Sequence, residues 1–145
     1  GAARAALLGL LDEGAGEVLI YNRTAERARA VARRIGGERA RVVPVIQGLD
    51  GEGFDLVVNT TRLGLEPGDP PPIDLARLSR AGAAMDLVYG REKTPFVLGA
   101  ERLGIRSTDG MEMLVQQAAS SFERWWNRPA PIDTMRAAVR GPLGR

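Results

Sequence analysis

Short apolar runs alternate with amphipathic stretches along the chain, and this pattern predicts alternating strands and helices. The clearest run is Val18–Tyr21, which has β-branched and aromatic members and follows the turn-forming residues 14–16. Such a run predicts a buried strand. After it, Thr24 is the predicted N-cap of a helix. Apolar residues recur in that helix at helical spacing, namely Ala28, Val31, Ala32 and Ile35.

The same alternation continues to the end of the chain. Further strands are predicted at 42–46, 55–59, 82–89 and around Ile105, and further helices at 75–78, 95–103, 109–125 and 132–139. Thr94 and Pro95 are the predicted start of the helix 95–103, with Pro at its first position. Pro44 lacks an N–H donor, so its strand is expected at a sheet edge. Strands alternating with helices over 145 residues predict one α/β domain with a parallel sheet.

The chain opens on a helix rather than on a strand. The apolar stripe of this helix consists of Ala2, Ala3, Ala6, Leu7, Leu10 and Leu11, and Gly14 is its expected terminator. In a βαβ dinucleotide-binding unit the first helix follows a strand and a Gly-rich turn, and its N-terminus binds the pyrophosphate. We therefore expect a domain truncated within that turn, with Gly1 as the last turn glycine. The alternative is that Gly1 is an arbitrary boundary that binds no phosphate.

Polar residues after the first predicted strand form a candidate nucleotide site. In such folds an acid at this position usually binds the ribose 2′-hydroxyl, whereas an Arg accommodates a 2′-phosphate. Here Asn22, Arg23 and Thr24 follow the strand, and Arg27 lies one helical turn further on. Guanidinium groups bind phosphate oxygens in a planar fork. The pattern favours an NADP phosphate site over the alternative of a capped helix with solvated arginines.

Other candidate residues follow later strands or lie on the longest helix. Thr60 and Thr61 follow the strand ending at Asn59, at the sheet edge where open α/β sheets bind ligands. Tyr89 ends the strand 82–89, and Asp86 within that strand is costly unless it is hydrogen-bonded. In the helix 109–125, Asp109 and Glu112 form a predicted capping box. The predicted apolar stripe of this helix consists of Met111, Leu114, Val115, Ala118, Phe122 and Trp125. Met113 and Gln117 share its flank, which is either a ligand-facing or a solvated surface.

The amino-acid composition argues against several classes of function. The chain has no His and no Cys, which excludes Ser-His-Asp and Cys-His catalysis within it and argues against a zinc site. The net charge is only +2, and no basic run carries interleaved aromatics, so nucleic-acid binding is not favoured. No apolar run is long enough to span a membrane, and no secretory signal pattern is present. Absence of Cys is compatible with the cytoplasm.

Five motifs, taken in order, resemble those of the shikimate dehydrogenase family across nearly the whole chain. They are Gly1-Ala-Ala-Arg-Ala5, Asn22-Arg-Thr-x-x-Arg27-Ala28, Asn59-Thr-Thr61-x-x-Gly64-Leu65, Asp86-Leu-Val-Tyr89 with Thr94, and Asp109-Gly-x-x-Met113-Leu114-x-x-Gln117-Ala118. The resemblance implies a Rossmann-like, doubly wound parallel sheet lacking its first strand. Residues 1–145 would then be a single NADP-binding domain, truncated at its N-terminus.

The resemblance also implies a reaction and a division of labour. The family interconverts 3-dehydroshikimate and shikimate with NADP in aromatic amino-acid biosynthesis. Its catalytic Lys–Asp pair lies in an N-terminal substrate domain that is absent here, so we expect no catalytic residue, no metal and no activity in this segment alone. By position, the resemblance implies two sets of contacts. The cofactor contacts would come from Gly1, Ala2, Asn22, Arg23, Thr24, Arg27, Thr60, Thr61 and Met113. The substrate contacts would come from Tyr89 and Gln117.

Two departures and three alternatives remain open. Arg62 and Arg91 stand where the family usually has proline, which leaves those loops less rigid. A quinate/shikimate oxidoreductase, a non-catalytic nucleotide-binding remnant and an Arg-rich nucleic-acid binder are the alternative functions. Oligomeric state is also open, with a homodimer as one form. If the missing strand is central, the isolated segment should expose two strand edges.

Overall fold

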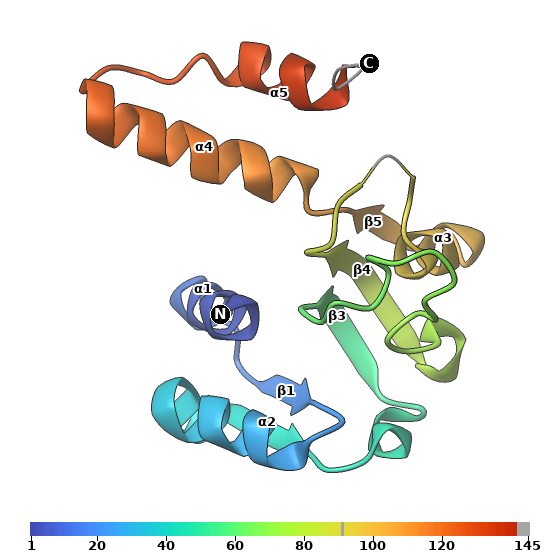
Figure 1. Ribbon diagram of the computed structural model, residues 1–145. Coiled ribbons are helices and arrows are strands. Elements are labelled where there is room, and N and C mark those ends of the chain that lie inside the picture. The colour runs from blue at the N-terminus through green and yellow to red at the C-terminus, as the bar shows by residue number, and fades with distance from the viewer. Residues whose placement is uncertain (91, 142–145) are drawn as a thin grey trace.

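The computed structural model describes residues 1–90 and 92–141 as alternating strands and helices (Figure 1). The strands are β1 (Val18–Tyr21), β2 (Ala40–Val43), β3 (Gly53–Asn59), β4 (Arg80–Asp86) and β5 (Arg106–Thr108). The α-helices are α1 (Ala2–Asp12), α2 (Ala25–Val31), α3 (Pro95–Arg102), α4 (Met111–Trp126) and α5 (Ile132–Arg140). A π-helical turn, η1 (Ala32–Gly36), extends α2, and short 3-10 turns are η2 (Gly37–Arg39), η3 (Ile46–Leu49) and η4 (Leu75–Arg77).

All the strand pairs are parallel, which confirms the predicted α/β class. One ladder joins β1 to β2, and a second joins β3, β4 and β5 in that order. Parallel neighbours need long crossover connections, and helices or helical turns supply them. Helices lie on both sides of the three-stranded ladder, because α3 is to its right and α1 and α4 are to its left in Figure 1. This is the arrangement of a Rossmann-like, doubly wound domain.

Several predicted boundaries shift. The strand expected at 42–46 ends at Val43, because Pro44 cannot donate to a ladder and Ile46 starts a 3-10 turn. Within the described residues β2 pairs only with β1, so the predicted edge position is confirmed. Tyr89 lies beyond the end of β4, and β5 begins one residue after Ile105.

A gap separates the two ladders. Within the described residues no ladder joins β1 to β3, and a cavity of about 490 Å³ lies between them, lined by residues of α1, β1 and β3. All four residues of β1 are therefore only half-buried, which corrects the prediction of a buried strand. Leu56 of β3 lines the same cavity and is 38% exposed. The expected exposed strand edges are thus present.

One apolar core connects the two ladders despite the gap. It contains Val43 from β2, Ala84 from β4 and Phe96 from α3, each at most 3% exposed. Leu49, Leu75, Leu78 and Ala100 complete the buried cluster. Part of β1 and β3 packs against it, because Leu19, Tyr21 and Phe54 are partly buried neighbours. Within the described residues, no helix has the length and apolarity that crossing a membrane requires.

Helices α4 and α5 form an antiparallel pair at the end of the chain, shown in orange and red in Figure 1. The predicted apolar stripe of α4 is correct at Val115, which is 2% exposed, but wrong at its C-terminal end. Trp125 and Trp126 are 80% and 63% exposed, because this end of α4 extends past the sheet. Ala119, rather than Ala118, is the second buried residue of the helix.

Helix starts follow the predicted capping residues in two of three places. Thr94 precedes α3, and its Oγ1 accepts a hydrogen bond from the Val97 N–H at 3.2 Å. Thr24 is the N-cap of α2, as predicted. The capping box at α4 is wrong, because Gly110 is the N-cap and Glu112 pairs with α5. Asp109 still accepts a hydrogen bond from the Met111 N–H at 3.0 Å.

Candidate functional site

The residues that follow β1 present a short, polar strand-to-helix connection. Asn22 Oδ1 accepts a hydrogen bond from the Thr24 N–H at 2.9 Å, which fixes the turn into α2. In this arrangement the Thr24 hydroxyl makes no capping bond and its residue is exposed. Thr24 therefore presents a free hydroxyl beside the first N–H groups of α2, where an anion is favoured.

Two arginines beside this turn lack acidic partners. Across residues 1–90 and 92–141, no ion pair engages Arg23 or Arg27, and both residues are exposed. Arg29 on the same helix, by contrast, pairs with Glu26. The carboxylate of Glu26 therefore pairs with Arg29, which is not one of the predicted site residues. Two guanidinium groups remain to receive a doubly charged oxyanion such as a phosphate monoester.

The second predicted phosphate-binding position is the start of α1. Gly1 is the N-cap, and its carbonyl accepts hydrogen bonds from Arg4 N–H at 3.0 Å and Ala5 N–H at 3.2 Å. The N–H groups of the first turn before Arg4 have no partner within the helix. They give this end of α1 the partial positive charge that a pyrophosphate requires. Ala3 and Ala6 of α1 and Thr60 line the same cavity beside β1.

The carboxyl ends of β3 and β4 are joined by a buried polar network. Asp86 is 0% exposed and Asn59 is 3% exposed. Asn59 Nδ2 donates to Asp86 Oδ1 at 2.9 Å, and Asn59 Oδ1 accepts from the Thr61 N–H and hydroxyl at 2.9 and 2.8 Å. The predicted cost of Asp86 within a strand is therefore offset by hydrogen bonds. The network also fixes the loop that carries Thr60 and Thr61.

The predicted contacts to substrate and nicotinamide lie on two separate segments, the residues after β4 and helix α4. Tyr89 follows β4 and is 43% exposed, whereas Met113 is half-buried and Gln117 is exposed on α4. The segments approach each other at Gly110, because its N–H donates to Val88 O at 3.1 Å. A Cβ built on Gly110 would lie 2.3 Å from Leu87 O. The exposed Arg62 ends at the surface, and Arg91 lies outside the described residues.

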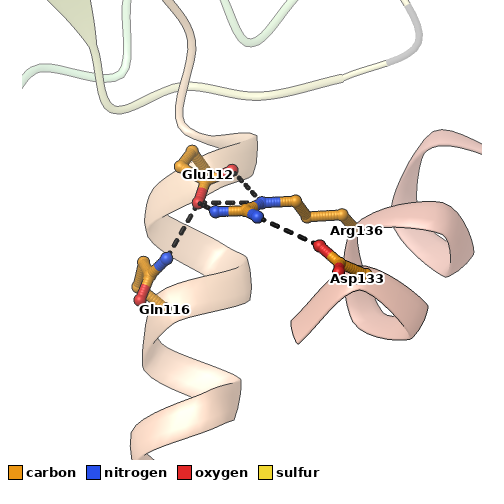
Figure 2. Close-up of polar contacts among 4 residues, drawn as sticks. All are labelled: Glu112, Gln116, Asp133 and Arg136. Atoms are coloured by element: carbon orange, nitrogen blue, oxygen red, sulfur yellow. Dashed lines mark hydrogen bonds and ion pairs between the residues drawn. The ribbon is translucent and has the colours of Figure 1, made fainter. Parts of the chain in front are cut away.

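Arg136 of α5 holds the first turn of α4, as Figure 2 shows. Its Nη2 and Nε donate to the two oxygens of Glu112 at 2.6 and 3.0 Å, and its Nη1 donates to Asp133 at 3.3 Å. Gln116 also donates to Glu112, at 2.8 Å. Hydrogen bonding to Glu112 raises the pKa of the Arg136 guanidinium above its ordinary value, so this fork stays charged.

Sequence reasoning missed two residues that shape these segments and one contact of a third. Gly110 permits a close backbone contact, and Arg136 braces α4. Thr94 was predicted to start a helix, but its hydrogen bond to Asp86 was not. The sequence held a signal for Gly110, because a glycine directly before a helix often marks close approach of two backbones. It held no comparable signal for Arg136, whose partner Glu112 is 24 residues away.

Comparisons with known proteins place these features in context. A family model described as the shikimate 5′-dehydrogenase C-terminal domain matches residues 110–140. The chain is 40% identical over 147 residues to the shikimate dehydrogenase (NADP(+)) of Nitrobacter winogradskyi, and the match covers 99% of this chain and 52% of that protein. The chain spans about half the length of the curated relatives it matches.

Two solved structures share the fold over nearly the whole chain. Shikimate dehydrogenase from Aquifex aeolicus is 27% identical with a TM-score of 0.83, covering 97% of this chain and 50% of that one. The Thermus thermophilus enzyme, solved in complex with NADP(H) and shikimate, is 33% identical with a TM-score of 0.77. That match covers 93% of this chain and 49% of the other.

Proposed function

We propose that this chain, which matches about half the length of NADP-dependent shikimate dehydrogenases, is the NADP-binding part of such an enzyme. The whole enzyme would interconvert 3-dehydroshikimate and shikimate in the cytoplasm. The observation that carries the proposal concerns Arg23 and Arg27, which no ion pair engages within the described residues. They follow β1, the place where an NADP-binding domain of this fold accommodates a 2′-phosphate.

We propose the remaining cofactor contacts from residues that lie near the strand ends. Asn22 and Thr24 flank the 2′-phosphate, and the first N–H groups of α1, at Gly1 and Ala2, bind the pyrophosphate. Thr60 and Thr61 contact the cofactor between its pyrophosphate and its nicotinamide, and Met113 approaches the nicotinamide. The bound cofactor supplies the hydride, and this chain orients it.

The substrate is shared with a part of the enzyme outside residues 1–145. Tyr89 and Gln117 each have an exposed polar end, so they suit hydrogen bonds to a polyol hydroxyl. In the family that this chain resembles, the catalytic Lys–Asp pair lies in the N-terminal domain. We therefore assign the proton transfer to the carbonyl oxygen to a residue of that domain. Residues 1–145 alone are expected to be inactive.

The domain boundary is part of the proposal. The cavity between β1 and β3 has two strand edges beside it, and a parallel strand with apolar side chains would join the ladders into one sheet. We propose that this strand belongs to the same polypeptide and precedes residue 1. An intact mass near twice the 15.6 kDa of this segment would support it.

The test is an assay of the purified natural protein with four combinations of substrate and cofactor. Shikimate and quinate are each supplied with NADP⁺ or NAD⁺, and adenosine 2′,5′-bisphosphate is added as a competitor. We expect shikimate with NADP⁺ to react fastest and the bisphosphate to inhibit. Faster reaction of quinate would shift the assignment to a quinate enzyme. No dinucleotide binding at all would refute the proposal, and binding without turnover would leave a nucleotide-binding remnant.

A further inference from the structure

Asp86 is a buried carboxylate that accepts hydrogen bonds from three residues of the described part of the chain, Asn59, Val88 and Thr94, which lie on three different segments. Its Oδ1 accepts from Asn59 Nδ2 and from the Val88 N–H, both at 2.9 Å, and its Oδ2 accepts from Thr94 Oγ1 at 2.6 Å. The residue is 0% exposed. A buried carboxylate destabilises a fold unless its oxygens are satisfied, and all three partners here are donors. Asp86 therefore ties these segments to one point.

The first segment is the loop after β3. Asn59 is held by Asp86 and in turn accepts two hydrogen bonds from Thr61, so the position of this loop depends on the carboxylate. Gly64 continues the loop with φ +100°, and a Cβ built there would lie 3.1 Å from the Cβ of Thr94. The loop therefore packs directly against Thr94, which also binds Asp86.

The other two segments lead to the predicted substrate side. Val88 is adjacent to Tyr89, and Val88 O accepts from the N–H of Gly110, the N-cap of α4. Thr94 is the N-cap of α3. Asp86 is therefore connected through one or two hydrogen bonds to the threonine loop, to Tyr89 and to the helix with Met113. The arginines after β1 lie instead on the other ladder, across the gap.

We propose that Asp86 is a positioning residue for hydride transfer. It sets the threonine loop, Tyr89 and the start of α4 relative to one another, and thereby the geometry in which nicotinamide and substrate meet. Asp86 acts through Asn59, Val88 and Thr94 and contacts neither ligand. This inference rests on the proposed function. It predicts a division of the site, in which the adenosine half is independent of Asp86.

The experiment uses the natural protein and compares Asp86→Ala, Asp86→Asn and Thr94→Val with wild type. Misplacement of about 1 Å can reduce a rate about 100-fold. We expect kcat for NADP-linked shikimate oxidation to fall about 100-fold in Asp86→Ala and about tenfold in Thr94→Val. Asp86→Asn keeps one acceptor oxygen and should recover most of the rate. Affinity for adenosine 2′,5′-bisphosphate should stay within about twofold in all variants.

Asp74→Ala is the matched control, because Asp74 also accepts a backbone N–H bond, from Ala76 at 3.0 Å, but is exposed and caps a distant turn. It should leave kcat unchanged. If Asp86→Ala does not fold, Thr94→Val decides the question alone. Equal losses of kcat and of bisphosphate affinity would overturn the inference, because they would mean a general structural role.

Amide hydrogen exchange separates failure of this inference from failure of the proposed function. It is measured without ligand. Exchange should accelerate in Thr94→Val at residues 60–64 and 87–89 but not at residues 22–27. If wild type lacks the proposed activity, the function fails, and this localised acceleration would still support the role of Asp86 in holding the loops. Unchanged exchange at residues 60–64 and 87–89 would contradict that role.

Discussion

At the scale of single residues, the polar groups at the strand ends divide into two kinds. Asp86 and Asn59 are buried and satisfied by the protein itself. Arg23 and Arg27 are exposed, and within the described residues no ion pair engages them. Groups of the first kind fix the loops at the strand ends, because a buried polar group without a hydrogen bond would destabilise the fold. Groups of the second kind are available to a ligand.

The proposed phosphate clamp predicts a specific change of cofactor preference. Arg23→Ala should weaken binding of NADP⁺ about 10- to 100-fold, because a hydrogen bond to a charged group contributes about 1.5–3 kcal/mol. Binding of NAD⁺, which has no 2′-phosphate, should change less than about twofold. The measurement is calorimetric titration of the natural protein with both cofactors.

Arg34→Ala is the control for this titration, because Arg34 is an exposed arginine of η1 outside the predicted site. It should leave both affinities unchanged. Equal weakening of NADP⁺ and NAD⁺ by Arg23→Ala would refute a 2′-phosphate clamp.

At the scale of elements, the two ends of α4 differ: the first turn is held against the segment after β4 and against α5, whereas the last turn contacts only the chain that follows it among the described residues. Gly110 contacts the segment after β4, and Arg136 binds Glu112 through a two-pronged ion pair. The opposite end carries Trp125 and Trp126 at 80% and 63% exposure. The site side of α4 is therefore its fixed end, where Met113 lies.

Gly110→Ala should destabilise the protein and displace α4. The added Cβ would lie 2.3 Å from Leu87 O and 2.8 Å from Leu87 C, and backbone atoms cannot move aside cheaply. We expect the free energy of unfolding to fall by about 1–3 kcal/mol, measured by equilibrium denaturation. Gly9→Ala is the control, because Gly9 lies inside α1 and the added Cβ would have no described atom within 4 Å beyond its chain neighbours and its own helix backbone. It should stabilise by about 0.5–1 kcal/mol. Similar effects of both changes would contradict the tight contact.

Arg136→Leu should loosen α5 from α4 without unfolding the sheet. The substitution removes the fork that holds Glu112, so amide exchange in residues 132–139 should accelerate. Arg124→Leu removes an exposed arginine of α4 that has no ion pair among the described residues, and it should leave exchange in α5 unchanged. Protection of α5 that survives in Arg136→Leu would show that apolar contacts alone hold the pair.

At the scale of the whole molecule, the dominant feature is the gap between the two ladders. The cavity of about 490 Å³ leaves Leu56 and the residues of β1 half-exposed. Apolar side chains in that condition forgo much of the stabilisation that full burial gives. The proposal that another strand fills this space in the natural protein therefore has a consequence for stability.

Leu56→Ala tests whether the gap is filled. If a strand covers Leu56 in the natural protein, the substitution should cost more than about 2 kcal/mol, as in a packed core. Leu98→Ala is the matched control, since Leu98 on α3 is 40% exposed, close to the 38% of Leu56. It should cost less than about 1 kcal/mol. Equal, small effects of both substitutions in equilibrium denaturation would contradict a filled gap.

The sequence by itself determined the local structure at several helix starts and the order of strands and helices. Thr94 and Pro95 start α3 as predicted, because capping and a fixed φ act within one turn. The alternation of apolar runs and amphipathic stretches specified the parallel α/β class. Arg23 and Arg27 were identified from their place after β1. Each of these features depends on residues that are close together in the chain.

Only the tertiary structure decided which distant groups meet and which surfaces stay open. Asp86 and Asn59 are 27 residues apart, and Arg136 and Glu112 are 24 apart, so no local pattern pairs them. The exposure of Trp125 and the half-burial of β1 likewise depend on what packs beside them, not on their own periodicity. Hydrophobic spacing indicates the side of an element that seeks cover, whereas the fold determines whether a neighbour is there to provide it.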